Sequence, residues 1–104
     1  MEIVVQSGQL AVSEALRTHV ARSLERALAG HRLWVRRIEV QLSATACVVR
    51  VRLHRLLAIA VRQPGSDLYT AVARAARAAG SAVARRMARR IRVKRVFGLR
   101  GAGA

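Results

Sequence analysis

The side chains of this sequence that could do chemistry are its arginines, and the chemistry they suit is the binding of phosphate. Twenty of the 104 residues are Lys or Arg and five are Asp or Glu, which gives a formal charge of +15. Every cation except Lys94 is Arg, whose planar guanidinium matches phosphate oxygens and stacks on bases. A GC-rich genome would also favour Arg over Lys, and both explanations stay open. The charge itself predicts a polyanionic partner, either nucleic acid or an anionic membrane surface.

The positive charge is concentrated near the end of the chain. Residues 1–67 carry ten basic and five acidic side chains, whereas residues 68–104 carry ten basic and none acidic. Ordinary solvated helix faces mix both signs to limit repulsion, so this pattern favours phosphate binding, with little readout of base sequence. The predicted RNA-binding residues of this part are Arg74, Arg77, Arg85, Arg86, Arg89, Arg90, Arg92 and Lys94.

Two smaller groups complete the candidate set, Arg22 and Arg26 in the first half and Arg50 and Arg52 further on. The alternative to RNA contact is an ordinary surface ion pair. A cross-strand pair with Glu39 would contribute roughly 0.2 to 1 kcal/mol, but one glutamate cannot neutralise both strand arginines. The two interpretations are equally supported for both groups.

Catalysis and metal binding have little support in the sequence. The four Glu and one Asp are scattered over different elements, so neither an acid and base pair nor a carboxylate-held metal is expected. His19, His31 and His54 lack the spacing of metal ligands. Cys47, the one cysteine, can form no internal disulfide and is better explained as a small core residue than as a nucleophile. We expect a non-enzyme with no cofactor, no metal and no small-molecule substrate.

Two aromatic rings could also bind RNA by stacking. Trp34 and Tyr69 lie near the expected starts of a strand and a helix, which favours packing over the stacking platforms of single-strand binders. Tyr69 is expected to rest on the edge of the sheet.

The composition predicts one globular domain. Hydrophobic residues make up 53% of the chain, and only three residues are aromatic, so the core must be built from Val, Leu, Ile and Ala. No secretory signal is indicated, and the longest central apolar run, residues 56–61, falls far short of the ~20 residues that span a bilayer. We expect a soluble, cytoplasmic protein with a domain at residues 1–97 and a flexible segment at 98–104.

The elements that must position the arginines follow from the periodicity. Residues 3–5 suit a strand, and a helix should start at Ser13 as cap and end at Gly30. From residue 37 the period changes to two, which predicts strands at 37–42, 49–53 and 57–61, with a turn near 54–56 that lacks the usual Gly or Asn.

A second, longer helix should follow the breaker at residues 63–67. Ser66 or Asp67 can cap it, and an apolar stripe predicts a helix to residue 92, which Gly80 weakens by ~1 kcal/mol. A strand joined to the next by a helix is normally its parallel neighbour, and the later strands can pair as hairpins. The sequence thus predicts an α+β fold, β-α-β-β-β-α, with a four-stranded mixed sheet and two helices on one face.

Two motifs resemble a known family. ALRTHV at residues 15–20, with Leu24 four residues later, is similar to the first-helix pattern A-L-R-x-x-V-x-x-x-L of ribosome hibernation-promoting factors. SDLYTAV at residues 66–72 is similar to their D-M-Y-x-A-I opening of the second helix. The chain therefore resembles the short, single-domain form of these ribosome-associated translation inhibitors, which are sigma-54 modulation protein-like, over residues 1 to about 94.

The resemblance implies a function. Family members bind in the mRNA and tRNA channel of the small ribosomal subunit, so the expected partners are 16S rRNA in that subunit and the whole 70S ribosome, with translation stopped in stressed cells. Two positions that are usually basic in the family are Ala78 and Ser81 here. The resemblance therefore assigns the RNA-binding charge of this part of the helix only to Arg85, Arg86 and Arg89. A divergent paralogue with altered binding stays open.

Two other functions remain as alternatives. One is a generic RNA- or DNA-binding module of the same fold, without ribosome specificity. The other is a membrane-surface protein that uses residues 83–97 as a basic amphipathic segment, although arginines around the whole helix argue against a clean apolar face.

Overall fold

The structure is a computed structural model that describes residues 1–8 and 10–103, with side chains up to residue 89 except at residue 56. The chain forms, in order, β1 (Glu2–Gln6), α1 (Glu14–Ala27), η1 (Ala29–Trp34), β2 (Val35–Leu42), β3 (Ala46–Leu53), η2 (His54–Leu56), β4 (Ala58–Pro64) and α2 (Leu68–Gly103), where η1 and η2 are 3-10 helices. The predicted β-α-β-β-β-α order is confirmed.

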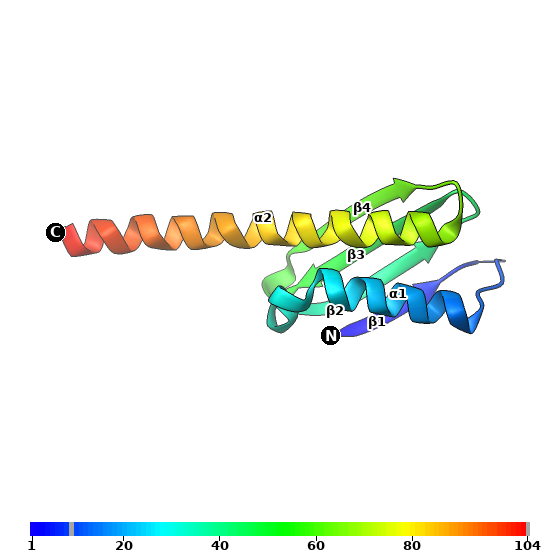
Figure 1. Cartoon of the computed structure of the whole chain (residues 1–104). Helices are drawn as coiled ribbons and strands as arrows, with labels where there is room; N and C mark the ends of the chain where they lie inside the picture. The colour runs from blue at the N-terminus through cyan, green and yellow to red at the C-terminus, as the bar shows by residue number, and fades with distance from the viewer. Residues whose placement is uncertain (9, 104) are drawn as a thin grey trace.

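The four strands form one mixed sheet in the order β1-β2-β3-β4 (Figure 1). β1 runs parallel to β2, with Ile3 opposite Ile38, because α1 returns the chain to the end where β1 began. The pairs β2 with β3 and β3 with β4 are antiparallel, as tight connections allow. The sheet is the predicted one, with β1 and β4 at its edges.

Both helices cover the same face of this sheet (Figure 1). α2 packs on β3 and β4, and α1 packs beside α2. The apolar side chains of β2 and β3 alternate toward the helices as the period of two requires. The matching stripe of α2 consists mostly of small residues, which lets the helix lie close to the sheet. Its buried members are Ala71, Val72, Ala75, Ala76, Ala79, Val83 and Met87.

Each long helix has a side-chain cap at its first turn. In α1, Leu16 N donates to Ser13 Oγ at 3.1 Å, as predicted. In α2, Thr70 N donates to Asp67 Oδ1 at 2.9 Å and Thr70 Oγ1 donates to Asp67 Oδ2 at 3.0 Å. These hydrogen bonds favour the charged carboxylate and lower the pKa of Asp67. Of the two predicted caps, Asp67 therefore holds the start of α2.

Gly80 has a packing role that the helix pattern did not reveal. A Cβ atom at this position would lie 2.7 Å from the carbonyl oxygen of Ala27. Only glycine allows α1 and α2 to cross this closely, so the loss of helix propensity at Gly80 is compensated by the contact between the helices.

Several predicted boundaries were wrong. Leu28 caps α1, and Gly30, predicted to end it, lies inside the unpredicted η1. β3 starts at Ala46, and β4 extends to Pro64, which we had placed in the breaker. A proline is tolerated at the end of an edge strand, where a lost donor costs no central ladder bond.

The turn between β3 and β4 lies where it was expected, in η2. Arg55 takes the left-handed conformation there, with φ of 65°. A non-glycine residue fills the role that we had expected Gly or Asn to play. α2 continues to Gly103, past the end that we had predicted at residue 92. The flexibility of residues 98–104 and the domain boundary at residue 97 stay predictions.

Candidate nucleic-acid interface

The described arginines of α2 are exposed in two groups along the helix, Arg74 and Arg77 near its start and Arg85, Arg86 and Arg89 further on. All five described members are exposed, while the apolar stripe behind them is buried. No acidic residue follows Asp67, so α2 supplies no charge that could neutralise them. We call Arg74, Arg77, Arg85, Arg86 and Arg89 the helix face. The predicted sites Arg90, Arg92 and Lys94 lie beyond residue 89, outside the described side chains.

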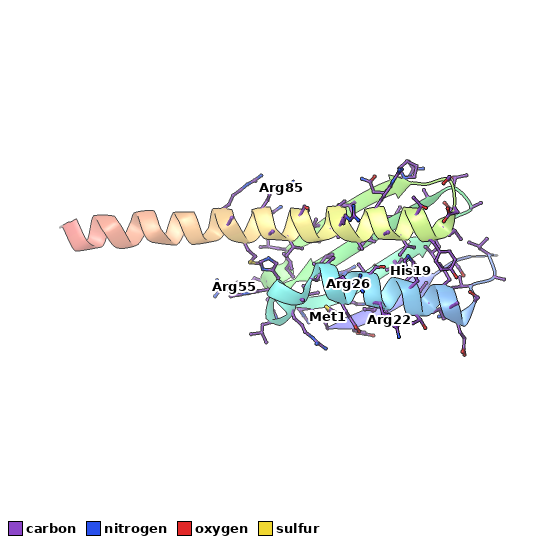
Figure 2. The ribbon with its side chains drawn as sticks, viewed as in Figure 1. Met1, His19, Arg22, Arg26, Arg55 and Arg85 are labelled. Atoms are coloured by element: carbon purple, nitrogen blue, oxygen red, sulfur yellow. The ribbon has the colours of Figure 1, made fainter. Side chains whose placement is uncertain are left out.

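Arg85 lies where α2 reaches the end of the sheet (Figure 2), and Arg86 and Arg89 line the same groove as Arg85. They border this shallow groove of about 160 Å³ together with Ile59 of β4 and Ala82 of α2. Arg86 lies toward the apolar stripe on a helical wheel, yet its side chain is exposed. In these turns only Met87 is buried among residues 84–89, so three guanidinium groups are accessible at one place.

The first helix adds one arginine to this surface. Arg26 of α1 and Arg77 of α2 line a groove of about 280 Å³ between the helices, floored by alanines and bordered by Ser23 and His19. Arg22 is exposed on α1 but does not line the groove (Figure 2). The structure therefore brings Arg26, but not Arg22, next to an arginine of the helix face.

His19 and Tyr69 connect the two helices at the other end of this groove. His19 Nε2 and the carbonyl oxygen of Tyr69 are 3.0 Å apart, and the two rings lie 5.0 Å apart between centroids. His19 is half-buried, as an ordinary structural histidine would be. The ring of Tyr69 contacts His19 of α1, whereas we had expected it to rest on the sheet edge.

Arg50 and Arg52 lie on the opposite side of the molecule. They alternate with buried Val49 and Val51 along β3, so their side chains point away from the helices. Arg52 Nε donates to Glu39 Oε1 at 3.0 Å. This outer sheet face is thus a second basic surface, which the structure does not join to the helix face.

Glu39 is the acidic partner of two arginines on the outer sheet face. Its Oε1 atom also lies 3.7 Å from Arg37 Nε, and within the described residues both ion pairs involve this one glutamate. The expected cross-strand pair forms diagonally, because Glu39 faces Arg50 in the register but pairs with Arg52. As expected, one glutamate cannot neutralise the whole group.

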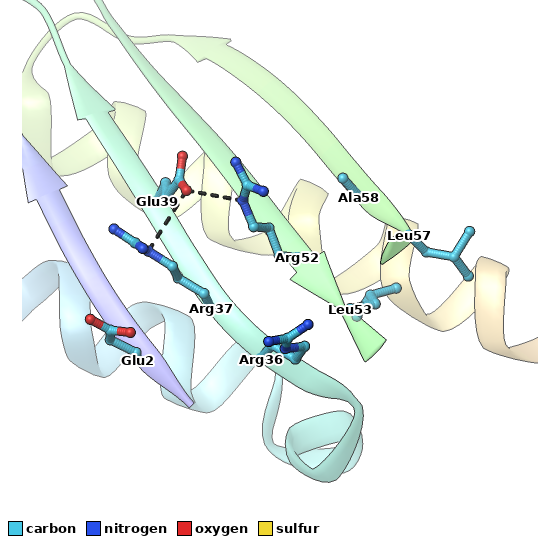
Figure 3. A pocket seen from close by; sticks show the side chains of 8 residues that line it. All are labelled: Glu2, Arg36, Arg37, Glu39, Arg52, Leu53, Leu57 and Ala58. Carbon is cyan, nitrogen blue, oxygen red and sulfur yellow. Dashed lines mark hydrogen bonds and ion pairs between the residues drawn. The ribbon is translucent and has the colours of Figure 1, made fainter. Parts of the chain in front are cut away.

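Sequence reasoning missed two arginines beside the pair of Arg52 and Glu39, namely Arg36 and Arg37. Arg36, Arg37 and Arg52 line a pocket of about 450 Å³ on the outer sheet face (Figure 3). The adjacent pair Arg36-Arg37 was a signal, because a strand of period two cannot place both on one face without an irregularity. Arg62 of β4 is also exposed on this face and was not among the candidates.

The remaining reactive side chain is the thiol of Cys47, which lies in the core. Cys47 is fully buried, and burial raises the pKa of its thiol to about 11, so it stays protonated. This confirms the predicted core position. Among the residues that the structure describes, no three His, Cys, Asp or Glu side chains are grouped as a metal site would require. No helix within the described part of the chain has the length and apolar character to cross a membrane.

Comparisons with known proteins agree with this architecture. A ribosomal subunit interface protein from Coxiella burnetii has a TM-score of 0.74 at 20% identity, over 85% of this chain and 99% of that one. The N-terminal domain of Thermus thermophilus Protein Y has a TM-score of 0.66 at 22% identity, over 81% and 93%. Similarity at this level of identity establishes the shared fold. No curated protein sequence matches the chain significantly.

A comparison of the sequence with protein families identifies the family of this chain. The family described as sigma 54 modulation protein / S30EA ribosomal protein matches residues 3–91, which include every element from β1 to β4 and most of the described part of α2. This confirms the resemblance that the two helix motifs indicated. The chain belongs to the sigma 54 modulation protein / S30EA ribosomal protein family, and hence to a group of ribosome-associated proteins.

Proposed function

We propose that this protein binds the small ribosomal subunit through phosphates of its 16S rRNA and blocks the channel for mRNA and tRNA. The observation that carries the proposal is the helix face, where five exposed arginines stand on one helix with no acidic residue beside them. Family membership supports the ribosome as the polyanion, and the Coxiella burnetii relative is itself described as a ribosomal subunit interface protein.

The mechanism is occlusion without chemistry. Guanidinium groups of the helix face and of Arg26 neutralise rRNA phosphates and release condensed counterions, which supplies most of the binding free energy. The sheet and α1 support α2, so the arginines stay in place when they meet the RNA. A protein held in the channel excludes mRNA and tRNA sterically, and the 70S ribosome is a second target on the same grounds. Its place of action is the cytoplasm.

Binding by charge alone would also suit any folded RNA, so the test must separate the ribosome from RNA in general. We expect the protein to sediment with intact small subunits at a salt concentration that removes it from naked RNA of equal length. The same preparation should inhibit translation in a cell-free system at stoichiometric amounts. Equal loss from subunits and naked RNA would contradict the proposal and favour a generic RNA-binding module.

A ribosome profile of stationary cells tests the proposal inside the cell. We expect the protein in the fractions that contain small subunits and 70S ribosomes, and we expect a high-salt wash to release it. Its presence only in the ribosome-free fraction would count against a ribosomal role.

A further inference from the structure

We propose that the pocket on the outer sheet face binds a nucleotide, with its phosphate on Arg36, Arg37 and Arg52 and its sugar or base on Leu57 and Ala58. All five residues line one cavity of about 450 Å³ (Figure 3). This volume lies within the range of about 300 to 1,000 Å³ that small-molecule sites occupy.

An irregularity in β2 builds the basic half of the pocket. Val35 pairs with Leu53 and Arg37 pairs with Arg52, so Arg36 is an extra residue in β2 with no partner of its own in β3. Such a bulge turns a side chain away from the regular alternation. Arg36 is exposed and Arg37 is half-buried, and both line the same cavity. The bulge thereby gives one strand two arginines at a single site.

The arginines of the pocket still have capacity for an anion. Arg37 Nε is buried and has no hydrogen-bond partner within the described part of the chain, since Glu39 Oε1 is 3.7 Å away. Nε itself is buried, but 43% of the Arg37 side chain is exposed, so a ligand oxygen can reach the outer part of its guanidinium group. Arg52 uses Nε for Glu39, yet its side chain remains 62% exposed. A phosphate can therefore bind without breaking the pair between Arg52 and Glu39.

The charge of the pocket limits the ligand. Glu2 and Glu39 line it beside the three arginines, which leaves a net charge of +1. A long polyanion would meet two carboxylates here, whereas one phosphate group meets mainly the arginines. The opposite wall is apolar, formed by Leu53, Leu57 and Ala58. A nucleotide has one phosphate group for the arginines and a flat, weakly polar sugar and base for the apolar wall. It therefore fits the pocket better than phosphate alone.

Two sources can supply this chemistry, a free nucleotide or one nucleotide of a bound RNA. The first stands apart from the proposed function, and the second rests on it. Both place a phosphate on the same arginines, so the experiment needs one arm for each source.

The test follows backbone amide shifts of the full chain by NMR during titration with inorganic phosphate, adenosine 5′-monophosphate and a short single-stranded RNA. We expect the monophosphate or the RNA to shift the amides of Arg36, Arg37, Leu57 and Ala58, and the monophosphate to bind more tightly than inorganic phosphate. Shifts with the free nucleotide identify it as the ligand; shifts with RNA alone identify a nucleotide of the RNA.

Neighbouring alanines on β4 supply a matched pair of variants. Ala58→Glu places a carboxylate in the pocket, whereas Ala60→Glu places the same charge on the same face opposite Arg50, outside the pocket. Both residues are exposed, so both variants are expected to fold. We expect Ala58→Glu to weaken nucleotide binding by about tenfold or more. Ala60→Glu should bind like the wild type, and Arg36→Gln should weaken binding as a second check.

Three results would overturn this inference. They are the absence of shifts at the pocket amides with either nucleotide ligand, equal losses in Ala58→Glu and Ala60→Glu, and equal affinity for phosphate and adenosine 5′-monophosphate. Sedimentation of the same variants with small subunits keeps the two proposals apart. An Ala58→Glu chain that loses pocket binding but still sediments with subunits supports the pocket and leaves the helix face intact.

Discussion

The helix face and the outer sheet face use the same side chain in two electrostatic settings. On α2, the exposed arginines follow one another with no acidic residue after Asp67. On the sheet, Glu39 pairs with Arg52 and lies close to Arg37. The helix face needs an external anion to relieve its repulsion, whereas the sheet face is partly neutralised from within. We infer that the helix face provides affinity for a polyanion and the sheet face discriminates among smaller ligands.

Reversing the charge of the helix face should give the largest loss of ribosome binding. The triple variant Arg85→Glu, Arg86→Glu, Arg89→Glu should bind small subunits about a hundredfold more weakly or worse, because about three phosphate contacts are lost. Its plot of log affinity against log salt should become shallower by about three units of slope. Sedimentation at several salt concentrations measures both quantities.

The matched control reverses three arginines on the outer sheet face, Arg50, Arg52 and Arg62. We expect a loss of less than about tenfold, since this face lies away from the helices. Equal losses from the two triple variants would show that the faces do not differ in the way we infer.

The contact between the helices can be broken without touching any charge. Gly80→Ala should lower the free energy of unfolding by about 1 to 3 kcal/mol, because the new Cβ meets the backbone of Ala27 at 2.7 Å. Helix propensity alone predicts the opposite, a gain of about 1 kcal/mol. Chemical denaturation of the variant decides between them.

Ser81→Ala is the control for this variant, since Ser81 is the exposed neighbour of Gly80 on the same helix. It should gain about 0.5 kcal/mol or less from propensity. A stabilised Gly80→Ala chain would show that the helices can separate at no cost, and that the helix face does not need α1 to hold it.

The start of α2 should depend on pH. The folded-state pKa of Asp67 is lowered by the hydrogen bonds from Thr70, so its stabilising effect is present above the pKa of the unfolded chain. This contribution is lost as the pH falls through the lower pKa of the folded state. Asn caps helices without titrating, so Asp67→Asn should show a weaker fall in melting temperature below about pH 4. Melts of both chains that decline in parallel would contradict this role of Asp67.

Removing the glutamate of the sheet face should give the smallest effect. Glu39→Gln releases Arg52 and should cost about 0 to 1 kcal/mol of stability, because the pair is partly exposed. We expect RNA affinity to rise severalfold as the sheet face becomes more like the helix face. Glu25→Gln makes the same change in net charge on α1, and a similar rise there would attribute the effect to overall charge instead.

The sequence predicted those features that repeat along the chain. The period of two located the three later strands, and the stripe with its caps located both helices. The absence of acid after Asp67 pointed to the helix face, and the exposed arginines agree with it. These features are local, so neighbouring residues alone carry the information.

The missed features depend on contacts between distant segments. Gly80 is explained only by Ala27, more than fifty residues earlier, and the pairing of Arg52 with Glu39 depends on the register of two strands. The bulge at Arg36 also arises from that register. Arg55 adopts a positive φ because the two strands around it must be joined closely, whatever residue stands there.

The buried Cys47 has a practical consequence for mapping the bound state. It is the one cysteine of the chain, and its thiol is both inaccessible and protonated at neutral pH. A cysteine introduced on either basic face would therefore be the one thiol that a maleimide dye or photo-crosslinker labels in the native protein. Attachment sites on α2 and on β4 can be compared in an otherwise natural chain, with no substitution in the core.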